Sequence, residues 1–390
     1  MKTTNINILL SQLLQRLEEQ ERAPLSKKVF VGFDGFIDRI RKPVKRRNEG
    51  EIVYYYETLG EFAERIRQAA GKSGQIELIT KKIKVGGNAP ILAHALGKLG
   101  VANYCAGSMG SPQLHPLFSE INSNCKKISL LNPGESDAVE FNDGKMIFSQ
   151  LSVFENYNWN YIKTSAMMSG IRKAVMGSAL LAFVDWVNLP LASDIWDGVL
   201  HDIIKPSGRK DFIFLFDLCD PSKKTVLQID QVLDLISSFS PYGKVTLGLN
   251  ENETIKIWCA IHGVDTDKSK IPTVEAAGDS VFKSMDIDCL LVHPIDRVIA
   301  YRKNQTLEIQ GRLVTSPKVL TGGGDNLNAG YCLGLLRKLP FEQCVLLGIA
   351  ASGSYIENGE SSDVTAIVKY LETWRQEMLL ATTKSHELHG

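Results

Sequence analysis

The stretch that decides the fold is Thr321-Gly322-Gly323-Gly324-Asp325-Asn326-Leu327-Asn328-Ala329-Gly330. Three glycines run into an acid, and apolar residues then recur at helical spacing. A glycine run that opens a helix directs backbone N–H groups at one point, where the helix dipole adds positive potential. The stretch predicts an anion site beside a carboxylate, Asp325, that can take a proton from an attacking hydroxyl. The alternative is a glycine-rich turn that Asp325 caps.

A second glycine-rich turn, Val85-Gly86-Gly87-Asn88-Ala89-Pro90, precedes another helical pattern that ends at Gly100. Asn88 is a good helix N-cap, and Pro90 suits the first helical turn. The two glycines let the backbone approach a ligand closely. A well-formed turn between a strand and a helix, without any ligand, explains the same residues equally well.

Short apolar runs with the character of buried strands are each followed by polar residues. The runs are Val29–Phe33, Ala179–Val184, Ile213–Phe216 and Val245–Leu249. Asp34 and Asp38 follow the first run, and Asn250 to Glu253 follow the last. Polar residues at the carboxyl ends of parallel strands predict a doubly wound α/β sheet with a site along one edge. Turn residues and helix caps are the alternative for these acids.

Composition excludes some classes of function. The 390 residues carry 44 basic and 44 acidic side chains, which argues against binding to nucleic acid or to an anionic membrane. The seven cysteines form no C-x-x-C pair and stand in apolar settings, as expected of reduced thiols in a cytoplasmic protein. Leucines from Leu9 to Leu17 predict an amphipathic N-terminal helix rather than a signal peptide.

Two further segments stand apart from the alternation of strands and helices. Asp137–Phe141 and Lys145–Phe148 flank Asn142-Asp143-Gly144, a hairpin signal that predicts a small lid or accessory sheet. The basic run Arg39–Arg47 is interpreted as a solvated loop, the usual structure of a charge run.

The two glycine-rich turns, in this order, resemble the signatures of the ribokinase family, also called the PfkB carbohydrate kinases. Asn250-Glu251-Asn252-Glu253 resembles the family's N-x-x-E element, and Asp217 to Ser222 resembles the D-x-N strand end before it. The resemblance covers Val29 to about Asp363. It implies a three-layer α/β/α sandwich with a mainly parallel central sheet and a small β lid.

The domain organisation expected from this resemblance is an N-terminal helical extension over residues 1–24 and one kinase domain over residues 25–380. Parts of 40–58 and 135–160 are expected to form the lid sheet, which excludes water during the reaction.

The resemblance also implies roles for single residues. Asp325 is the base for transfer of the terminal phosphate of a nucleotide, expected to be ATP, with an anion hole formed by Gly322, Gly323 and Gly324. Mg²⁺ is held by Asn250 and Glu253, partly through water. The alternative for these two residues is a helix cap with an acid in the first turn. The hydroxyls of the acceptor are bound by Asp34, Asp38, Gly86, Gly87 and Asn88. Asn250, His293 and Asn358 are predicted to contact the nucleotide. For His293 the alternative is a structural role, which is the more common one for a lone histidine.

The chain departs from the family pattern at several places, one of which is Leu327, where the family usually has Phe. Val319 and Leu320 replace the Asp-Thr pair that often precedes the glycines, which questions a monovalent-cation site. His293 to Val298 stands where the family has T-x-G-x-x-G, without its glycines, so nucleotide contacts must differ there.

The leading hypothesis is a sugar kinase. The alternatives are a nucleoside kinase, in which Phe33, Phe36 and Tyr54 to Tyr56 would stack on the base, and a non-catalytic regulator on the same fold. The expected partner is a small sugar or nucleoside. Binding to nucleic acid or to a membrane is not expected, and a homodimer is possible from the sequence.

Overall fold

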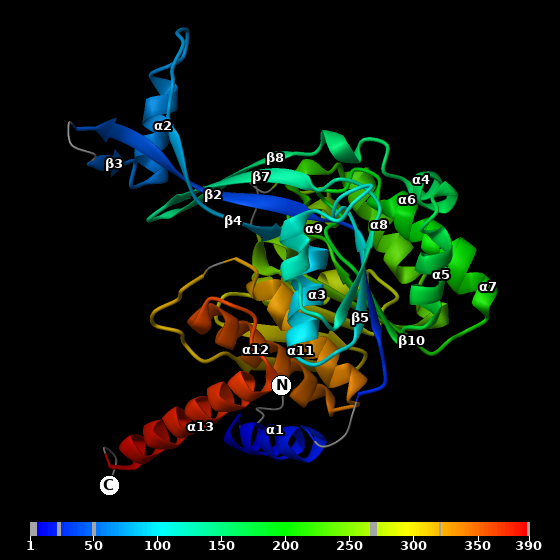
Figure 1. Cartoon of the computed structure of the whole chain (residues 1–390). Coiled ribbons are helices and arrows are strands. Elements are labelled where there is room, and N and C mark those ends of the chain that lie inside the picture. Colours follow the sequence, from blue (N-terminus) through cyan, green and yellow to red (C-terminus); the bar gives the residue numbers. More distant parts are fainter. Residues whose placement is uncertain (1–5, 22–24, 49–51, 266–270, 320, 388–390) are drawn as a thin grey trace.

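A nine-stranded sheet forms the centre of the molecule (Figure 1). The computed structural model describes residues 6–21, 25–48, 52–265, 271–319 and 321–387. The strand order is β14-β13-β12-β11-β10-β9-β1-β5-β6; pairing is parallel from β12 to β6 and antiparallel in β12-β13-β14. The strands are β1 (Val29–Gly32), β5 (Asn103–Gly107), β6 (Cys125–Ser129), β9 (Leu180–Phe183), β10 (Phe212–Asp217), β11 (Gly243–Asn250), β12 (Cys289–His293), β13 (Arg297–Arg302) and β14 (Gln305–Gln310).

Helices cover both faces because alternate strand residues point to opposite sides. Val29 and Val31 belong to one apolar core, and Phe30 belongs to the other. The first core includes side chains of α1 (Ile6–Glu21), α3 (Asn88–Lys98), α11 (Gly323–Leu336), α12 (Phe341–Asn358) and α13 (Val364–Glu387). The second includes side chains of α4 (Trp159–Thr164), α5 (Met168–Met176), α6 (Ala192–Val199), α8 (Val226–Ser237), α9 (Glu251–His262) and α10 (Val274–Lys283). The predicted three-layer sandwich is confirmed.

The N-terminal helix is part of the larger structure. In α1, Leu9, Leu10, Leu13, Leu14 and Leu17 are at most 5% exposed and belong to the same core as α12 and α13. Figure 1 shows α1 beside α13, which it contacts. The predicted amphipathic helix is confirmed, whereas the expected boundary at residue 24 lies outside the described residues. Within the described chain, no helix has the length and apolarity needed to cross a membrane.

A second, five-stranded sheet, here called the lid, projects from the body (Figure 1). Its order is β3-β2-β7-β8, and β4 also pairs with β2. Its strands are β2 (Phe36–Arg47), β3 (Val53–Tyr55), β4 (Leu78–Gly86), β7 (Gly134–Phe141) and β8 (Gly144–Gln150), and α2 (Leu59–Arg67) packs beside them. The hairpin predicted around Asn142-Asp143-Gly144 is confirmed as the connection from β7 to β8.

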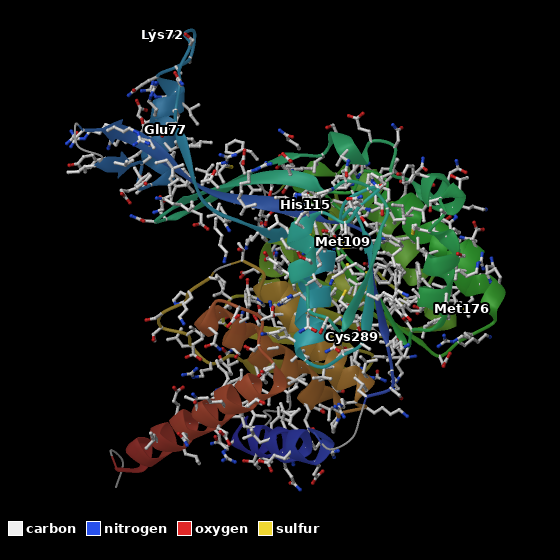
Figure 2. All side chains as sticks on the ribbon, in the orientation of Figure 1. Lys72, Glu77, Met109, His115, Met176 and Cys289 are labelled. Atoms are coloured by element: carbon white, nitrogen blue, oxygen red, sulfur yellow. The ribbon has the colours of Figure 1, made fainter. Side chains whose placement is uncertain are left out.

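The interpretation of Arg39–Arg47 as a loop is wrong, because these residues form most of β2. A lid sheet is solvated, so its strands can carry charges, and neighbouring strands supply opposite ones. Arg39 pairs with Glu135 at 2.8 Å and Arg41 with Asp137 at 2.6 Å, both across the β2–β7 pairing. Near the far end of the lid, marked by Lys72 and Glu77 in Figure 2, Arg47 pairs with Glu77 at 2.5 Å.

Close packing between α4 and α6 gives a stability prediction. A Cβ atom on Gly198 would lie 2.0 Å from Cγ of Trp159, whose indole donates to Asp202 at 2.7 Å and so cannot move freely. Gly198→Ala should therefore lower the free energy of unfolding by about 1–3 kcal/mol, which thermal or urea unfolding would measure.

Gly170→Ala is the matched control, since Gly170 lies in α5 and a Cβ atom added there would meet no neighbouring atom within 4 Å. Helix propensity alone should make this variant more stable by about 0.5–1 kcal/mol. Equal unfolding free energies for the two variants would contradict the close contact at Trp159.

Candidate active site

The glycine triplet opens α11 as the sequence predicts. Gly322 is the N-cap with φ of 90°, a left-handed conformation that favours glycine. A Cβ there would lie 2.8 Å from the hydroxyl oxygen of Tyr355, which donates to the carbonyl of Thr321 at 2.7 Å. The first amides of a helix have no partner within the helix, so those of α11 form a ready anion site. Asp325 lies in this first turn and is 6% exposed.

The second glycine-rich turn meets the first through one hydrogen bond. Nδ2 of Asn88, in the first turn of α3, donates to Oδ1 of Asp325 at 3.1 Å. Gly87 is the N-cap of this helix, with φ of 90°. The structure therefore brings together two motifs that lie more than two hundred residues apart in the sequence, as the 237-residue separation of this bond shows.

Both glycines of this turn make room for predicted acceptor-binding acids. A Cβ on Gly87 would lie 2.4 Å from Oδ2 of Asp34, and one on Gly86 would lie 2.2 Å from Oδ1 of Asp38. Oδ1 of Asp34 accepts from the Ala89 amide at 2.8 Å, and the Asp34 carboxyl group also faces the Asp185 carboxylate. Burial, followed by the charge of Asp185, raises the pKa of Asp34, so its carboxyl group can carry a proton and donate it to Asp185 in a hydrogen bond. Asp38 lies on the lid and accepts from the Ser136 hydroxyl.

Five carboxyl groups gather at the carboxyl edge of the sheet: Asp34, Asp185, Asp217, Glu253 and Asp325. Burial, followed by the charge of Asp217, raises the pKa of Asp325 well above its ordinary value. Burial likewise raises the pKa of Asp217 to about 6 and that of Glu253 to about 8. A cation or a proton is therefore favoured among these groups.

Neutral amides are the partners of four of these carboxylates. Besides the bond from Asn88 to Asp325, three such bonds are formed: Asn188 to Asp185 at 2.7 Å, Asn328 to Asp217 at 2.9 Å, and Asn250 to Glu253 at 2.7 Å. Amides satisfy the carboxylate oxygens without removing their charge. A cation that arrives with the substrate can therefore displace a proton from these groups and be held by the charge that remains.

The predicted magnesium residues, Asn250 and Glu253, hold each other at the start of α9. The Glu253 carboxylate accepts from both the amide N–H and the side chain of Asn250, and Asn250 in turn accepts from the Glu253 amide at 2.9 Å. Among the described residues, no group of three or more His, Cys, Asp or Glu side chains is arranged to hold a metal ion. These residues fit Mg²⁺ held through water, because Mg²⁺ keeps several waters and takes few protein ligands.

His293 and Asn358, the predicted nucleotide residues, occupy different places. His293 ends β12, and its Cε1 lies 3.4 Å from a Cβ position on Gly324, so it borders the glycine turn. Burial lowers the pKa of His293 to about 4, which keeps the imidazole neutral. Asn358 ends α12, where it donates to Ser354 and lines a cavity of about 630 Å³ that no residue of the glycine turn borders.

One lysine of the lid is not predicted from the sequence to be a site residue. Nζ of Lys145, at the start of β8, donates to Oγ1 of Thr321 at 3.1 Å, next to the glycine triplet. Burial lowers the pKa of Lys145, so an anion at the turn would stabilise its charge. Its position directly after the Asn142-Asp143-Gly144 turn is the only sequence signal, and that signal cannot show where the lid folds.

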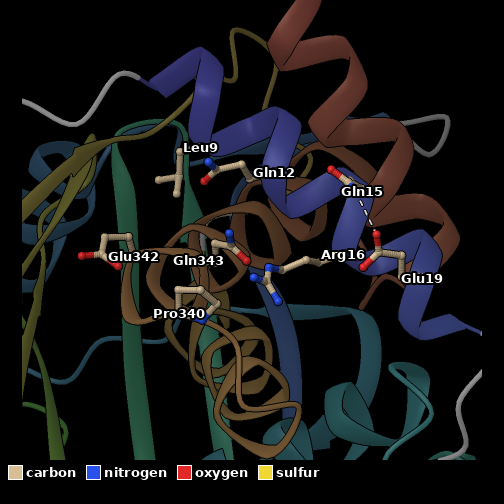
Figure 3. A pocket seen from close by; sticks show the side chains of 8 residues that line it. All are labelled: Leu9, Gln12, Gln15, Arg16, Glu19, Pro340, Glu342 and Gln343. Carbon is tan, nitrogen blue, oxygen red and sulfur yellow. Dashed lines mark hydrogen bonds between the residues drawn. The ribbon is translucent and has the colours of Figure 1, made fainter.

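Another cavity, of about 570 Å³, lies between α1 and the start of α12 (Figure 3). It is lined by Leu9, Gln12, Gln15, Arg16, Glu19, Pro340, Glu342 and Gln343. None of these residues is one of the five clustered acids described above, which are Asp34, Asp185, Asp217, Glu253 and Asp325. The candidate active site is therefore identified by its clustered carboxylates and its glycine turns, and not by the volume of a cavity.

The chain is similar to known proteins over most of its length. The family model described as prokaryotic ketohexokinase matches residues 14–374. A ketohexokinase of Haloferax volcanii is 24% identical over 334 residues, which cover 85% of this chain and 87% of that protein.

Solved structures show the same fold. A putative ribokinase II of E. coli superposes with a TM-score of 0.62 at 10% identity, covering 90% of this chain and 100% of that one. Arabidopsis thaliana ribokinase, solved with ribose and ATP, gives a TM-score of 0.58 at 16% identity and covers 89% and 98% of the two chains. From the family match and this fold, the chain belongs to the prokaryotic ketohexokinase family and is a carbohydrate kinase with a ribokinase-like fold.

Proposed function

We propose that this enzyme transfers the terminal phosphate of ATP to a hydroxyl of a ketohexose, with Asp325 as the base. The observation that carries the proposal is the bond from Asn88 to Asp325, because it joins the acceptor-binding turn to the glycine turn. The names of the family and of the Haloferax volcanii relative support a ketohexose as acceptor. The ATP bound by Arabidopsis thaliana ribokinase supports ATP as donor.

In the proposed reaction, the sugar lies between the lid and the carboxyl edge of the sheet. Asp34, Asp38 and Asn88 bind its hydroxyls, and the paired polar groups select among sugars. Asp325 removes the proton from the attacking hydroxyl, and its raised pKa favours that proton transfer once the carboxylate is ionised. Amides of Gly323 and Gly324, together with Lys145, stabilise the transferring phosphoryl group.

Asn250 and Glu253 would hold Mg²⁺ through water at the start of α9. The ion would neutralise phosphate charge, which is its main contribution to phosphoryl transfer. His293 borders the glycine turn as a neutral imidazole, so it can donate one hydrogen bond and accept another from the nucleotide without adding charge. The assignment of Asn358 as a nucleotide-binding residue is supported only by the resemblance to the ribokinase family.

A nucleoside acceptor is disfavoured by the aromatic residues that would have to stack on its base. Phe33 is fully buried and packs on Phe30 and Phe183, and Phe36 is 5% exposed and packs on Phe154. Tyr54 to Tyr56 lie on the lid, where Lys and Arg side chains cover their rings. Because these rings already contact protein side chains, their faces are less available to stack on a nucleoside base.

A cytoplasmic location is supported by the state of the cysteines. All seven are free and six are buried, as in proteins of a reducing compartment. Assembly as a homodimer and the lack of nucleic-acid partners stay predictions from the sequence.

The role of Asp325 is tested by Asp325→Asn. The carboxamide has a similar shape but cannot accept the hydroxyl proton, so kcat should fall by about 10²–10⁴-fold while the unfolding temperature changes little. Steady-state kinetics with fructose and Mg-ATP would measure this. Asp230→Asn, on the exposed face of α8, is the matched control and should keep full activity. Turnover of Asp325→Asn within a few-fold of wild type would remove Asp325 as the base.

The metal assignment is tested by Glu253→Gln. Glutamine preserves the capping box with Asn250, since Gln serves at this position, but removes the negative charge. The Mg²⁺ concentration for half-maximal rate should rise about tenfold, with less change in the KM for sugar. Glu251→Gln, in the same helical turn but exposed, should leave the Mg²⁺ titration unchanged. An unaltered titration together with a raised sugar KM would place Glu253 on the acceptor side instead.

A further inference from the structure

Cys219 stands in a strained position just beyond the end of β10. Its φ is 63°, a left-handed conformation that is uncommon for a residue other than glycine and is more often adopted by asparagine or aspartate. Cys219 is the third residue of Asp217-Leu218-Cys219. This stretch resembles the D-x-N strand end of the ribokinase family, in which the third residue is asparagine. Of the seven cysteines, Cys219 alone is partly rather than fully buried. Backbone strain of this kind persists only where neighbouring contacts hold it.

The thiol of Cys219 contacts the residue that joins the two glycine turns. Its Sγ lies 3.5 Å from Oδ1 of Asn88 and 4.0 Å from Oδ1 of Asp217. The backbone amide of Cys219 also donates to Oδ1 of Asp217, at 3.3 Å, which fixes the left-handed turn. Burial raises the pKa of this thiol, so it remains an S–H donor at neutral pH.

The orientation of the Asn88 side chain follows from its two neighbours. A thiol has one proton to donate, and Oδ1 of Asn88, at 3.5 Å, is nearer to it than Oδ1 of Asp217, at 4.0 Å. Toward Asn88 the thiol can donate only to the amide oxygen, and the ionised carboxylate of Asp325 can accept only from the amide nitrogen. Rotating the amide by half a turn would direct its oxygen at the carboxylate and its N–H groups at the thiol, which loses both bonds. The thiol and the carboxylate therefore select the same orientation.

We propose that Cys219 is a positioning residue, whose neutral thiol holds the Asn88 amide so that this amide donates to Asp325. The inference rests on the proposed role of Asp325 as base. No bond forms or breaks at sulfur, and the thiol keeps its proton throughout.

The consequence concerns the ionisation of Asp325. The bond from Asn88 lowers the pKa of Asp325 and so opposes the effects of burial and of the neighbouring acids. The groups that face Asp325 from the surrounding elements are Asp34, Asn88, Asp185, Asp217, Cys219, Glu253 and Tyr355. Without the thiol, the amide is free to turn, the carboxylate loses a donor, and the pKa of Asp325 rises. Since the base acts when ionised, activity then requires a higher pH.

The test compares the pH dependence of kcat in Cys219→Ala, Cys219→Ser and Cys125→Ala. Cys125 is a buried thiol on β6, at the far edge of the sheet, and serves as the matched control. In Cys219→Ala, the acid limb should move to higher pH and kcat at pH 7 should fall about three- to tenfold, approaching wild type at high pH. Sugar KM should change less than kcat. The serine hydroxyl is a donor and should restore most of the wild-type profile.

Two outcomes would overturn the proposal. One is a loss of activity in Cys219→Ala that is equal at all pH values, since that would indicate a merely structural role. The other is a profile identical to that of Cys125→Ala. The proposed function has a separate test. An active Asp325→Asn enzyme would contradict that function, whatever the Cys219 variants show.

Discussion

The structure depends on keeping several carboxylates close together in a buried place. Asp185, Asp217, Glu253 and Asp325 come from different elements, and each has an asparagine side chain as its partner. Burial is the main reason that the pKa values of these four groups rise, and repulsion between neighbouring carboxylates adds to it at Asp217, Glu253 and Asp325. Amides stabilise the carboxylates in position but leave their charge, which makes the free site receptive to cations. A kinase that binds its donor with Mg²⁺ can use this negative potential.

Glycine is needed in these turns because a side chain there would collide with residues that pack against the turns. A Cβ on Gly86 or Gly87 would collide with Asp38 or Asp34, and one on Gly322 would collide with Tyr355. The lid adds the opposite charge, since Lys145 reaches the glycine turn from β8. In the reaction that we propose, the sheet edge would supply the base, and the loops and lid would supply the donors that surround the phosphoryl group.

Much of this organisation could be predicted from the sequence because it depends on local patterns. An acid directly after an apolar strand, such as Asp34 after Val29–Phe33, indicates the carboxyl edge of a parallel sheet. This signal can be recognised without knowing the order of the strands. Pairing over long distances could not be predicted. The basic run Arg39–Arg47 forms a strand because Glu135 and Asp137 lie opposite it on β7. Lys145 and Cys219 gain their significance only from contacts with Thr321 and Asn88, which no local pattern encodes.

The claim that joins these observations is that the acceptor hydroxyl meets Asp325 at the junction of the two glycine turns. The most direct measurement is a crystal structure of the enzyme with fructose and a non-hydrolysable ATP analogue. The account predicts one sugar hydroxyl within hydrogen-bond distance of the Asp325 carboxylate, other hydroxyls on Asp34 and Asn88, and the terminal phosphate at Gly323 and Gly324. A sugar bound away from Asp325, or phosphates that do not contact the start of α11, would contradict it.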